Sequence, residues 1–245
     1  MIDLLKRLRQ AGRMFTQARM PRRARVEIEG KTIKERSAPG GIGAETAQFL
    51  ADRISDLRPE RVLECGPGAS TIMMARVMQK LGIDGTIVSL EHDEGWAEVA
   101  QSRIDEAGVH DFVDLVVTPL TPALGDHVER LNGCGVSEWY ESIDAIVERG
   151  PYDFVFVDGP PALDGRPRRA PVLPLLWDAI NDGAEIVLDD GNRPGEKETV
   201  RYWRDRFGPS IDGELLSLGK GLWHMHKRPL PDDVSSGSAA MTASG

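Results

Sequence analysis

Residues 61–71, Arg61-Val-Leu-Glu-Cys-Gly-Pro-Gly-Ala-Ser-Thr71, set the architecture of this chain. A short apolar run opens the stretch and is bounded by turn formers, which predicts a buried strand. The Gly-Pro-Gly turn at 66–68 follows, and from Ser70 to Gln79 the residues favour a helix. A strand, a glycine turn and a helix in this order predict a nucleotide-type site, because only glycine lets a ligand approach the backbone this closely.

The residues around the turn also indicate which nucleotide it binds. A dinucleotide-binding turn needs a third glycine, where the helix packs against the strand. Thr71 stands at that position here, and an acid, Glu64, ends the strand. A carboxylate beside the turn repels a pyrophosphate but can accept hydrogen bonds from a ligand ammonium or hydroxyl. The turn therefore favours S-adenosylmethionine over NAD, with an ordinary strand–helix turn as the alternative, since glycine-rich turns alone are weak motifs.

Composition excludes several classes of protein. The chain has 245 residues, 40% of them hydrophobic, and a net charge of −9. The length suits one α/β domain with a sizeable core, and the acidic balance argues against a nucleic-acid partner. Cys65 and Cys134 lack the spacing of metal ligands and indicate a reducing compartment. The sequence shows neither a membrane-spanning run nor a secretory signal, so we expect a cytoplasmic enzyme.

Three parts of the chain differ in composition. Residues 1–36 are predicted to form a basic amphipathic extension, because eight Lys and Arg residues within 1–25 oppose Asp3 alone and apolar residues recur at helical spacing. This extension could bind a membrane surface or a protein partner, or pack its apolar side on the domain. Residues 37–228 form the main domain, with an insertion at 118–150. Residues 229–245 have the composition of a disordered tail.

Strands and helices alternate along the main domain. After the first strand we expect strands at 86–91, 112–117, 152–158 and 184–190, and helices at 46–57, 94–107, 172–180 and 196–207. Within the insertion, apolar spacing predicts helices around 124–131 and 139–147. Near-continuous apolar strands separated by helices predict a parallel sheet covered on both faces. A glycine turn within 214–226 adds an antiparallel hairpin, so the prediction is an α/β fold with a doubly wound, mostly parallel seven-stranded sheet.

Acidic residues follow the apolar runs of four strands. They are Glu64, Glu91, Asp158 and the pair Asp189-Asp190. Because the carboxyl ends of parallel strands share one edge, where ligands bind in such sheets, we expect these side chains to gather there.

Glu91 has the spacing of a ribose ligand. It lies 23 residues beyond Gly68, near the usual separation for an acid that accepts from ribose hydroxyls. An acid at a helix N-terminus is the alternative interpretation. His92 is a weaker candidate for a place beside the adenine.

Four motifs in this order resemble the class I S-adenosylmethionine-dependent methyltransferases. They are Glu-Cys-Gly-Pro-Gly-Ala-Ser-Thr at 64–71, Ser-Leu-Glu-His-Asp at 89–93, Phe-Val-Phe-Val-Asp-Gly-Pro-Pro at 154–161 and Val-Leu-Asp-Asp-Gly-Asn-Arg-Pro-Gly-Glu at 187–196. The resemblance extends from about Gly40 to Lys227 and implies a Rossmann-like methyltransferase fold. It implies that S-adenosylmethionine is held by Glu64, Gly66, Gly68, Ser70, Thr71, Glu91 and His92.

Within this class, three acids resemble the metal positions of catechol-type O-methyltransferases. Asp158, Asp189 and Asp190 would suit a hard cation such as Mg²⁺, which lowers the pKa of a bound hydroxyl. The chain departs from that subgroup, because Asp190 stands where its triad has asparagine and Gly159-Pro160-Pro161 stands where a lysine base follows. Asp158 is the candidate catalytic residue. Alternatively, Asp189 caps the helix near Gly195 and Asp190 pairs with Arg193.

The acceptor is less well indicated than the cofactor. The Val-Asp-Gly-Pro-Pro and Leu-Asp-Asp motifs resemble an uncharacterised methyltransferase group near sugar and secondary-metabolite enzymes. Arg166, Arg168 and Arg169 could receive an anionic substrate or form a solvated loop. His224 and His226 share one face of the last strand, and neither is assigned a role.

The predicted function is O-methylation of a small-molecule or saccharide acceptor. The alternatives are an NAD-dependent dehydrogenase or epimerase, and an inactive methyltransferase-fold module recruited to a membrane or partner by the basic N-terminus. The oligomeric state is not indicated by the sequence.

Overall fold

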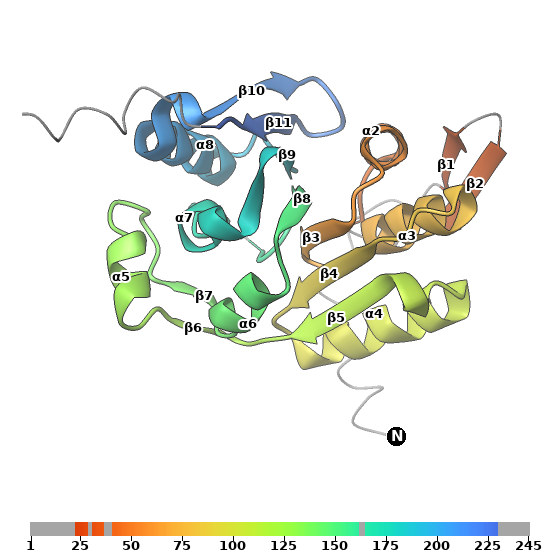
Figure 1. Cartoon of the computed structure of the whole chain (residues 1–245), viewed down its shortest axis with the longest axis horizontal. Coiled ribbons are helices and arrows are strands. Elements are labelled where there is room, and N and C mark those ends of the chain that lie inside the picture. The colour runs from red at the N-terminus through yellow and green to blue at the C-terminus, as the bar shows by residue number, and fades with distance from the viewer. Residues whose placement is uncertain (1–22, 29–30, 37–40, 162–164, 230–245) are drawn as a thin grey trace, which may run out of the picture.

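The centre of the molecule is a seven-stranded sheet with the order β10-β11-β9-β8-β3-β4-β5 (Figure 1). The computed structural model describes residues 23–28, 31–36, 41–161 and 165–229. β3, β4, β5, β8 and β9 are parallel, whereas β11 runs antiparallel to β9 and β10. The predicted α/β fold, with its mostly parallel sheet and antiparallel C-terminal hairpin, is therefore confirmed. The strands span β3 Arg61–Cys65, β4 Thr86–Glu91, β5 Val113–Val117, β8 Tyr152–Val157, β9 Ile180–Leu188, β10 Ile211–Leu216 and β11 Leu222–Lys227.

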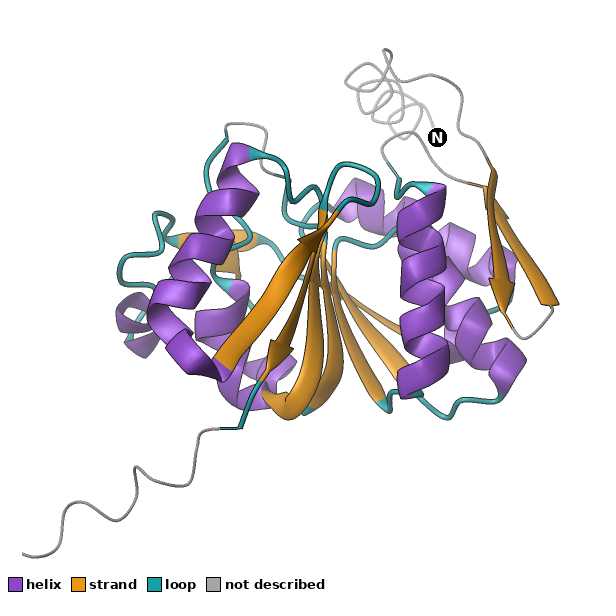
Figure 2. Ribbon diagram, turned by 90° about the horizontal axis from the view of Figure 1, so that it is seen from above, coloured by secondary structure: helices purple, strands orange, loops and turns teal. Residues whose placement is uncertain are grey.

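Helices cover both faces of the sheet (Figure 2). One face carries α2 Ala44–Leu57, α3 Ala69–Leu81 and α4 Glu94–Ala107. The other carries α6 Ile143–Glu148, α7 Val172–Leu176 and α8 Pro194–Phe207. Single-turn 3₁₀ helices also lie between these elements, at η1 His110–Phe112, η2 Trp177–Ala179 and η3 Gly208–Ser210. Among the described residues, none of the helices has the length and apolar character that crossing a membrane requires.

Each strand contributes to two cores because its side chains alternate between the faces. Val62 and Phe154 pack into the core beneath α2 and α3. Their neighbours Leu63 and Val155 pack into the core beneath α7 and α8. All four side chains are fully buried, which explains why the strand sequences are apolar without alternation.

The insertion differs from its prediction. It contains β6 Leu120–Pro122, α5 Asp126–Arg130 and β7 Glu138–Tyr140, and β6 pairs with β7. The helix predicted over 139–147 is wrong at its start, because Trp139 lies in β7 and α6 begins only at Ile143. Trp139 and Tyr140 are both 1% exposed and pack edge-on, with ring centroids 5.0 Å apart. Aromatic residues favour such strand packing over a helix that would expose one of them.

A short hairpin precedes the main domain and was not predicted from the sequence. It consists of β1 Arg23–Ile28 and β2 Lys31–Arg36. The Glu27 N–H donates to Gln48 Oε1 of α2 at 3.0 Å, and Gln48 Nε2 donates back to the Glu27 carbonyl at 3.0 Å. Of the predicted basic helix, residues 1–22 lie outside the described residues, and 23–25 belong to β1. The predicted tail beyond residue 229 also lies outside them.

Candidate active site

The carboxyl ends of β3 and β8 meet at the point where the strand order reverses, which is where open α/β sheets bind ligands. The loops that follow these two strands touch through Gly66 and Gly159. Gly66 has a φ of +93°, and a Cβ placed there would lie 3.1 Å from Gly159 N. The fold itself therefore requires glycine at position 66.

Gly68 is different, because nothing in the fold requires a glycine there. Its φ of −173° is extended backbone, and a Cβ at this position would meet none of the described residues within 4 Å. The space in front of the N-terminus of α3 is thus open at Gly68. Trp96 Nε1 of α4 donates to the Pro67 carbonyl at 3.1 Å and ties the loop down.

Glu64 lies beneath this loop and is fully buried. Its carboxylate accepts hydrogen bonds from Ser70 Oγ at 2.6 Å, Thr71 Oγ1 at 2.6 Å and Ser89 Oγ at 2.7 Å. The hydroxyls of Ser70 and Thr71 therefore point back towards β3 and bind Glu64. Burial raises the pKa of Glu64 to about 7, although the three hydroxyl bonds oppose this shift. In this arrangement Glu64 positions the loop from below.

The raised pKa of Glu64 predicts a pH-dependent stability. Because the folded pKa is about 7 and the ordinary value is 4.5, the contribution of Glu64 to stability is greatest at low pH and falls as pH rises through 7. Glu64→Gln removes this loss. We therefore expect the free energy of unfolding of the variant, measured relative to that of wild type, to increase by roughly 3 kcal/mol as pH rises from 4.5 to 7.

Urea unfolding of the cofactor-free protein at a series of pH values measures this difference. Glu60→Gln, at an exposed position just before β3, is the control and should follow the wild-type curve. Parallel curves for Glu64→Gln and wild type would contradict the prediction.

Glu91 ends β4 and is 4% exposed. Its Oε1 accepts from the backbone N–H groups of His92 at 2.7 Å and Asp93 at 2.8 Å, and lies 2.8 Å from His92 Nδ1. The hydrogen bond from His92 to Glu91 raises the pKa of that histidine, while partial burial opposes the shift. Among the described residues these contacts all converge on Oε1, which leaves Oε2 for a ligand.

Asp158, Asp189 and Asp190 gather at the ends of β8 and β9, as the sequence predicts. One carboxylate oxygen from each lies within 4.8 Å of the others. Arg169, only 3% exposed, lies among them. Its Nη2 donates to the carboxylate of Asp158 at 3.0 Å and to the Asp158 carbonyl, and its Nη1 donates to the Asp189 carbonyl at 3.0 Å.

The same guanidinium also meets two further acids. Nη2 is 3.6 Å from Asp190 Oδ2, and Nη1 is 3.4 Å from Glu196 Oε1. Asp190 has a φ of +58° and also pairs with Arg193 at 2.9 Å and Lys220 at 3.1 Å. The Asp190–Arg193 pair expected as an alternative is therefore present. The expected capping of α8 by Asp189 is wrong, because that helix has no side-chain cap.

Asp158 is the most accessible of these acids, with a side chain 24% exposed. Burial raises its pKa, Asp189 and Asp190 raise it further, and Arg169 opposes the shift. A carboxyl group with a raised pKa at the edge of a ligand site can accept a proton near neutral pH.

A cavity of about 100 Å³ adjoins the loop after β8. It is lined by Leu120, Val136 and Glu138 of the insertion and by Pro160, Arg166 and Arg168. Two of the three predicted substrate arginines thus face one cavity, whereas the third, Arg169, is buried in the acidic cluster. The sequence contained no signal for this difference.

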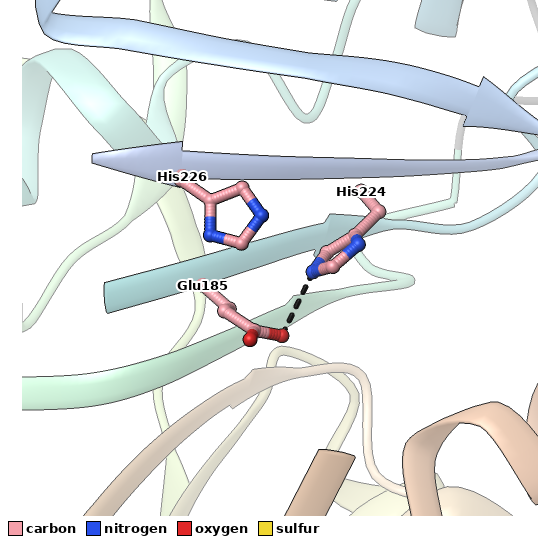
Figure 3. Close-up of side chains that lie close together, drawn as sticks. All are labelled: Glu185, His224 and His226. Carbon is pink, nitrogen blue, oxygen red and sulfur yellow. Dashed lines mark hydrogen bonds and ion pairs between the residues drawn. The ribbon is translucent and has the colours of Figure 1, made fainter. Parts of the chain in front are cut away.

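The two histidines of β11 lie in a separate cluster (Figure 3). His224 Nε2 is 2.8 Å from Glu185 Oε2, and Arg53 of α2 binds both oxygens of Glu185 at 2.9 and 3.1 Å. Glu185 is paired with Phe154 near the start of β8, away from the carboxyl ends of the strands. This cluster therefore joins α2 to the sheet and takes no part in the site.

The chain is similar to known methyltransferases in sequence and in fold. A methyltransferase domain model matches residues 63–191. The catechol O-methyltransferase of Mycobacterium tuberculosis is 34% identical over 159 residues, which cover 63% of this chain and 58% of that protein. The chain thus spans less than two thirds of this relative. The catechol O-methyltransferase of Niastella koreensis is 28% identical over 188 residues, covering 72% of this chain and 75% of that protein.

A solved structure shares the fold. The O-methyltransferase TomG from Streptomyces achromogenes, in complex with SAM, has a TM-score of 0.55 and 22% identity, covering 78% of this chain and 83% of that chain. None of these similarities bears on the narrower group suggested by the Val-Asp-Gly-Pro-Pro motif, which stays a prediction.

Proposed function

The chain belongs to the methyltransferase-domain family, and from this premise we propose that it transfers the methyl group of S-adenosylmethionine to a hydroxyl oxygen of a small molecule. The observation that carries the proposal is the open space at Gly68, which adjoins the N-terminus of α3 at the switch point of the sheet. The two catechol O-methyltransferase relatives support oxygen as the methyl acceptor. The family model and the missing third glycine both argue against the NAD-dependent alternative.

In this proposal the cofactor extends across the ends of β3 and β4. Its methionine part lies over Gly66 and Gly68, its ribose hydroxyls donate to Glu91 Oε2, and its adenine lies near His92. Glu64 acts indirectly, because its carboxylate is already bound by three protein hydroxyls and holds the start of α3 in place.

The protein's chemical task is alignment, because the sulfonium methyl is already activated. The acceptor hydroxyl loses its proton to Asp158, the new carbon–oxygen bond forms, and the sulfur–methyl bond breaks to leave S-adenosylhomocysteine. The cavity beside Pro160, with Arg166 and Arg168 on its wall, is the proposed place for the rest of the acceptor.

Magnesium, the candidate cofactor implied by the catechol-type resemblance, does not fit these residues as they are arranged. Mg²⁺ requires oxygen ligands at about 2.0–2.1 Å in near-octahedral geometry. A buried guanidinium already contacts Asp158 and Asp190 and binds the backbone of Asp189. We therefore derive no step through a metal.

Calorimetry with S-adenosylhomocysteine tests the cofactor site. Glu91→Ala removes a charged acceptor of ribose hydroxyls, so we expect about 10–100-fold weaker binding. Glu94→Ala, exposed in the first turn of α4, is the matched control and should bind like wild type.

Formation of S-adenosylhomocysteine from S-adenosylmethionine and catechol then tests the oxygen acceptor. Absence of any S-adenosylhomocysteine binding, together with a thermal shift on adding NAD, would overturn the proposal in favour of a dehydrogenase.

A further inference from the structure

We propose that Arg169 is a built-in cation that takes the place of a divalent metal among the carboxylates of the active site and positions Asp158 for proton transfer. This inference rests on the proposed function. It concerns how the acidic edge of the sheet is neutralised, and it is tested separately from cofactor binding.

The position of the guanidinium is that of a shared cation. Its Nη2 lies 3.0 Å from Asp158 Oδ1 and 3.6 Å from Asp190 Oδ2, so one nitrogen bridges acids from the ends of two adjacent strands. A metal bridging the same oxygens would have to occupy the same space and would lie against a positive charge. The two cations therefore exclude each other.

The backbone holds Arg169 in this place. Nη1 and Nη2 donate to the main-chain carbonyls of Asp189 and Asp158, so the side chain joins the ends of β8 and β9. These carbonyl contacts persist whether or not the carboxylates are protonated. An arginine held only by surface charges would be screened and mobile, whereas this one is 3% exposed.

Cationic side chains already offset most of the negative charge of this cluster without a metal. Four carboxylates, Asp158, Asp189, Asp190 and Glu196, are met by Arg169, Arg193 and Lys220. Four negative and three positive formal charges leave this cluster with a net charge of −1.

Arg169 also determines which carboxylate oxygen of Asp158 is available to the acceptor. Oδ1 is held by Arg169, so Oδ2 is the oxygen that can receive the acceptor proton. Arg169 is thus a positioning residue. A lysine at this position would keep the positive charge. It could not bind the carbonyls at the ends of β8 and β9 with two separate nitrogens, as Arg169 does.

Manganese binding followed by electron paramagnetic resonance tests the proposal without depending on turnover. Wild type should bind Mn²⁺ no better than about millimolar, whereas Arg169→Met leaves three carboxylates within 4.8 Å of one another and should bind it at least about tenfold more tightly. Asp189→Asn added to Arg169→Met should reverse the gain. Arg168→Met, one residue earlier, is the matched control and should gain none.

Two outcomes would overturn the proposal. One is that wild type binds Mn²⁺ and Asp189→Asn removes this binding. The other is that Arg169→Met is folded, as judged by thermal unfolding, and gains no affinity for Mn²⁺.

If Arg169→Met does not fold, the proposal is tested on wild type and Arg169→Lys instead. Both should bind Mn²⁺ no better than about millimolar, and their turnover should be unchanged by EDTA, whereas loss of turnover with EDTA overturns the proposal. Calorimetry with S-adenosylhomocysteine on the same samples reports separately on the proposed function.

Discussion

Gly68→Val should abolish detectable binding of S-adenosylhomocysteine, weakening it by a factor of about one hundred or more, while thermal stability stays close to that of wild type. The reason is steric. The backbone of Gly68 is extended and a Cβ there would meet no atom of the described part of the chain within 4 Å, so the fold should tolerate valine. If the methionine part of the cofactor fills that space, the two methyl groups of valine occupy it instead. Calorimetry and thermal unfolding on the same preparation measure both effects.

Two variants of the same loop make this prediction specific. Gly68→Ala adds one methyl group and should weaken binding less than valine does. Gly66→Ala should instead reduce stability by about 1–3 kcal/mol, because its φ is +93° and its Cβ would lie 3.1 Å from Gly159 N. Wild-type affinity in a folded Gly68→Val protein would show that the cofactor does not lie over this turn.

Asp158→Asn should lower turnover with catechol by about two to three orders of magnitude and leave affinity for S-adenosylhomocysteine within a factor of about three. Asparagine keeps an oxygen that can accept from Arg169 but cannot take the acceptor proton. Because the carboxylate is the active form and its pKa is raised, wild-type kcat should rise with pH as Asp158 loses its proton. The variant should lack this rise.

The control for this variant lies on the same strand. Asp153→Asn changes a carboxylate at the other end of β8, which accepts from the N–H groups of Glu60 and Arg61. It should affect stability without the selective loss of kcat. Equal turnover in Asp158→Asn and wild type would remove Asp158 from the reaction and move the search for a base to the cavity residues.

Much of the fold followed from local pattern. Continuous apolar runs with acids at their ends predicted the parallel strands and the edge where ligands bind, and the structure places Glu64, Glu91 and Asp158 at that edge. Periodicity carries this information because it reports which residues share a face of one element. It failed at Trp139, where the pairing of β6 with β7 overrides helix-like spacing.

The sequence by itself determined the order of the parallel strands and of the helices between them, the glycine turn at 66–68 and the acids at the ends of four strands, because these depend on neighbours along the chain. Only the tertiary structure decided what those acids contact. Glu64 is bound by Ser89, 25 residues away, and Asp158 is bound by Arg169, for which the sequence offers only a substrate-binding or a solvated role. The partner of a buried charge is set by how separate elements pack. No spacing in the sequence records that Arg169 lies where the sequence suggested a magnesium ion.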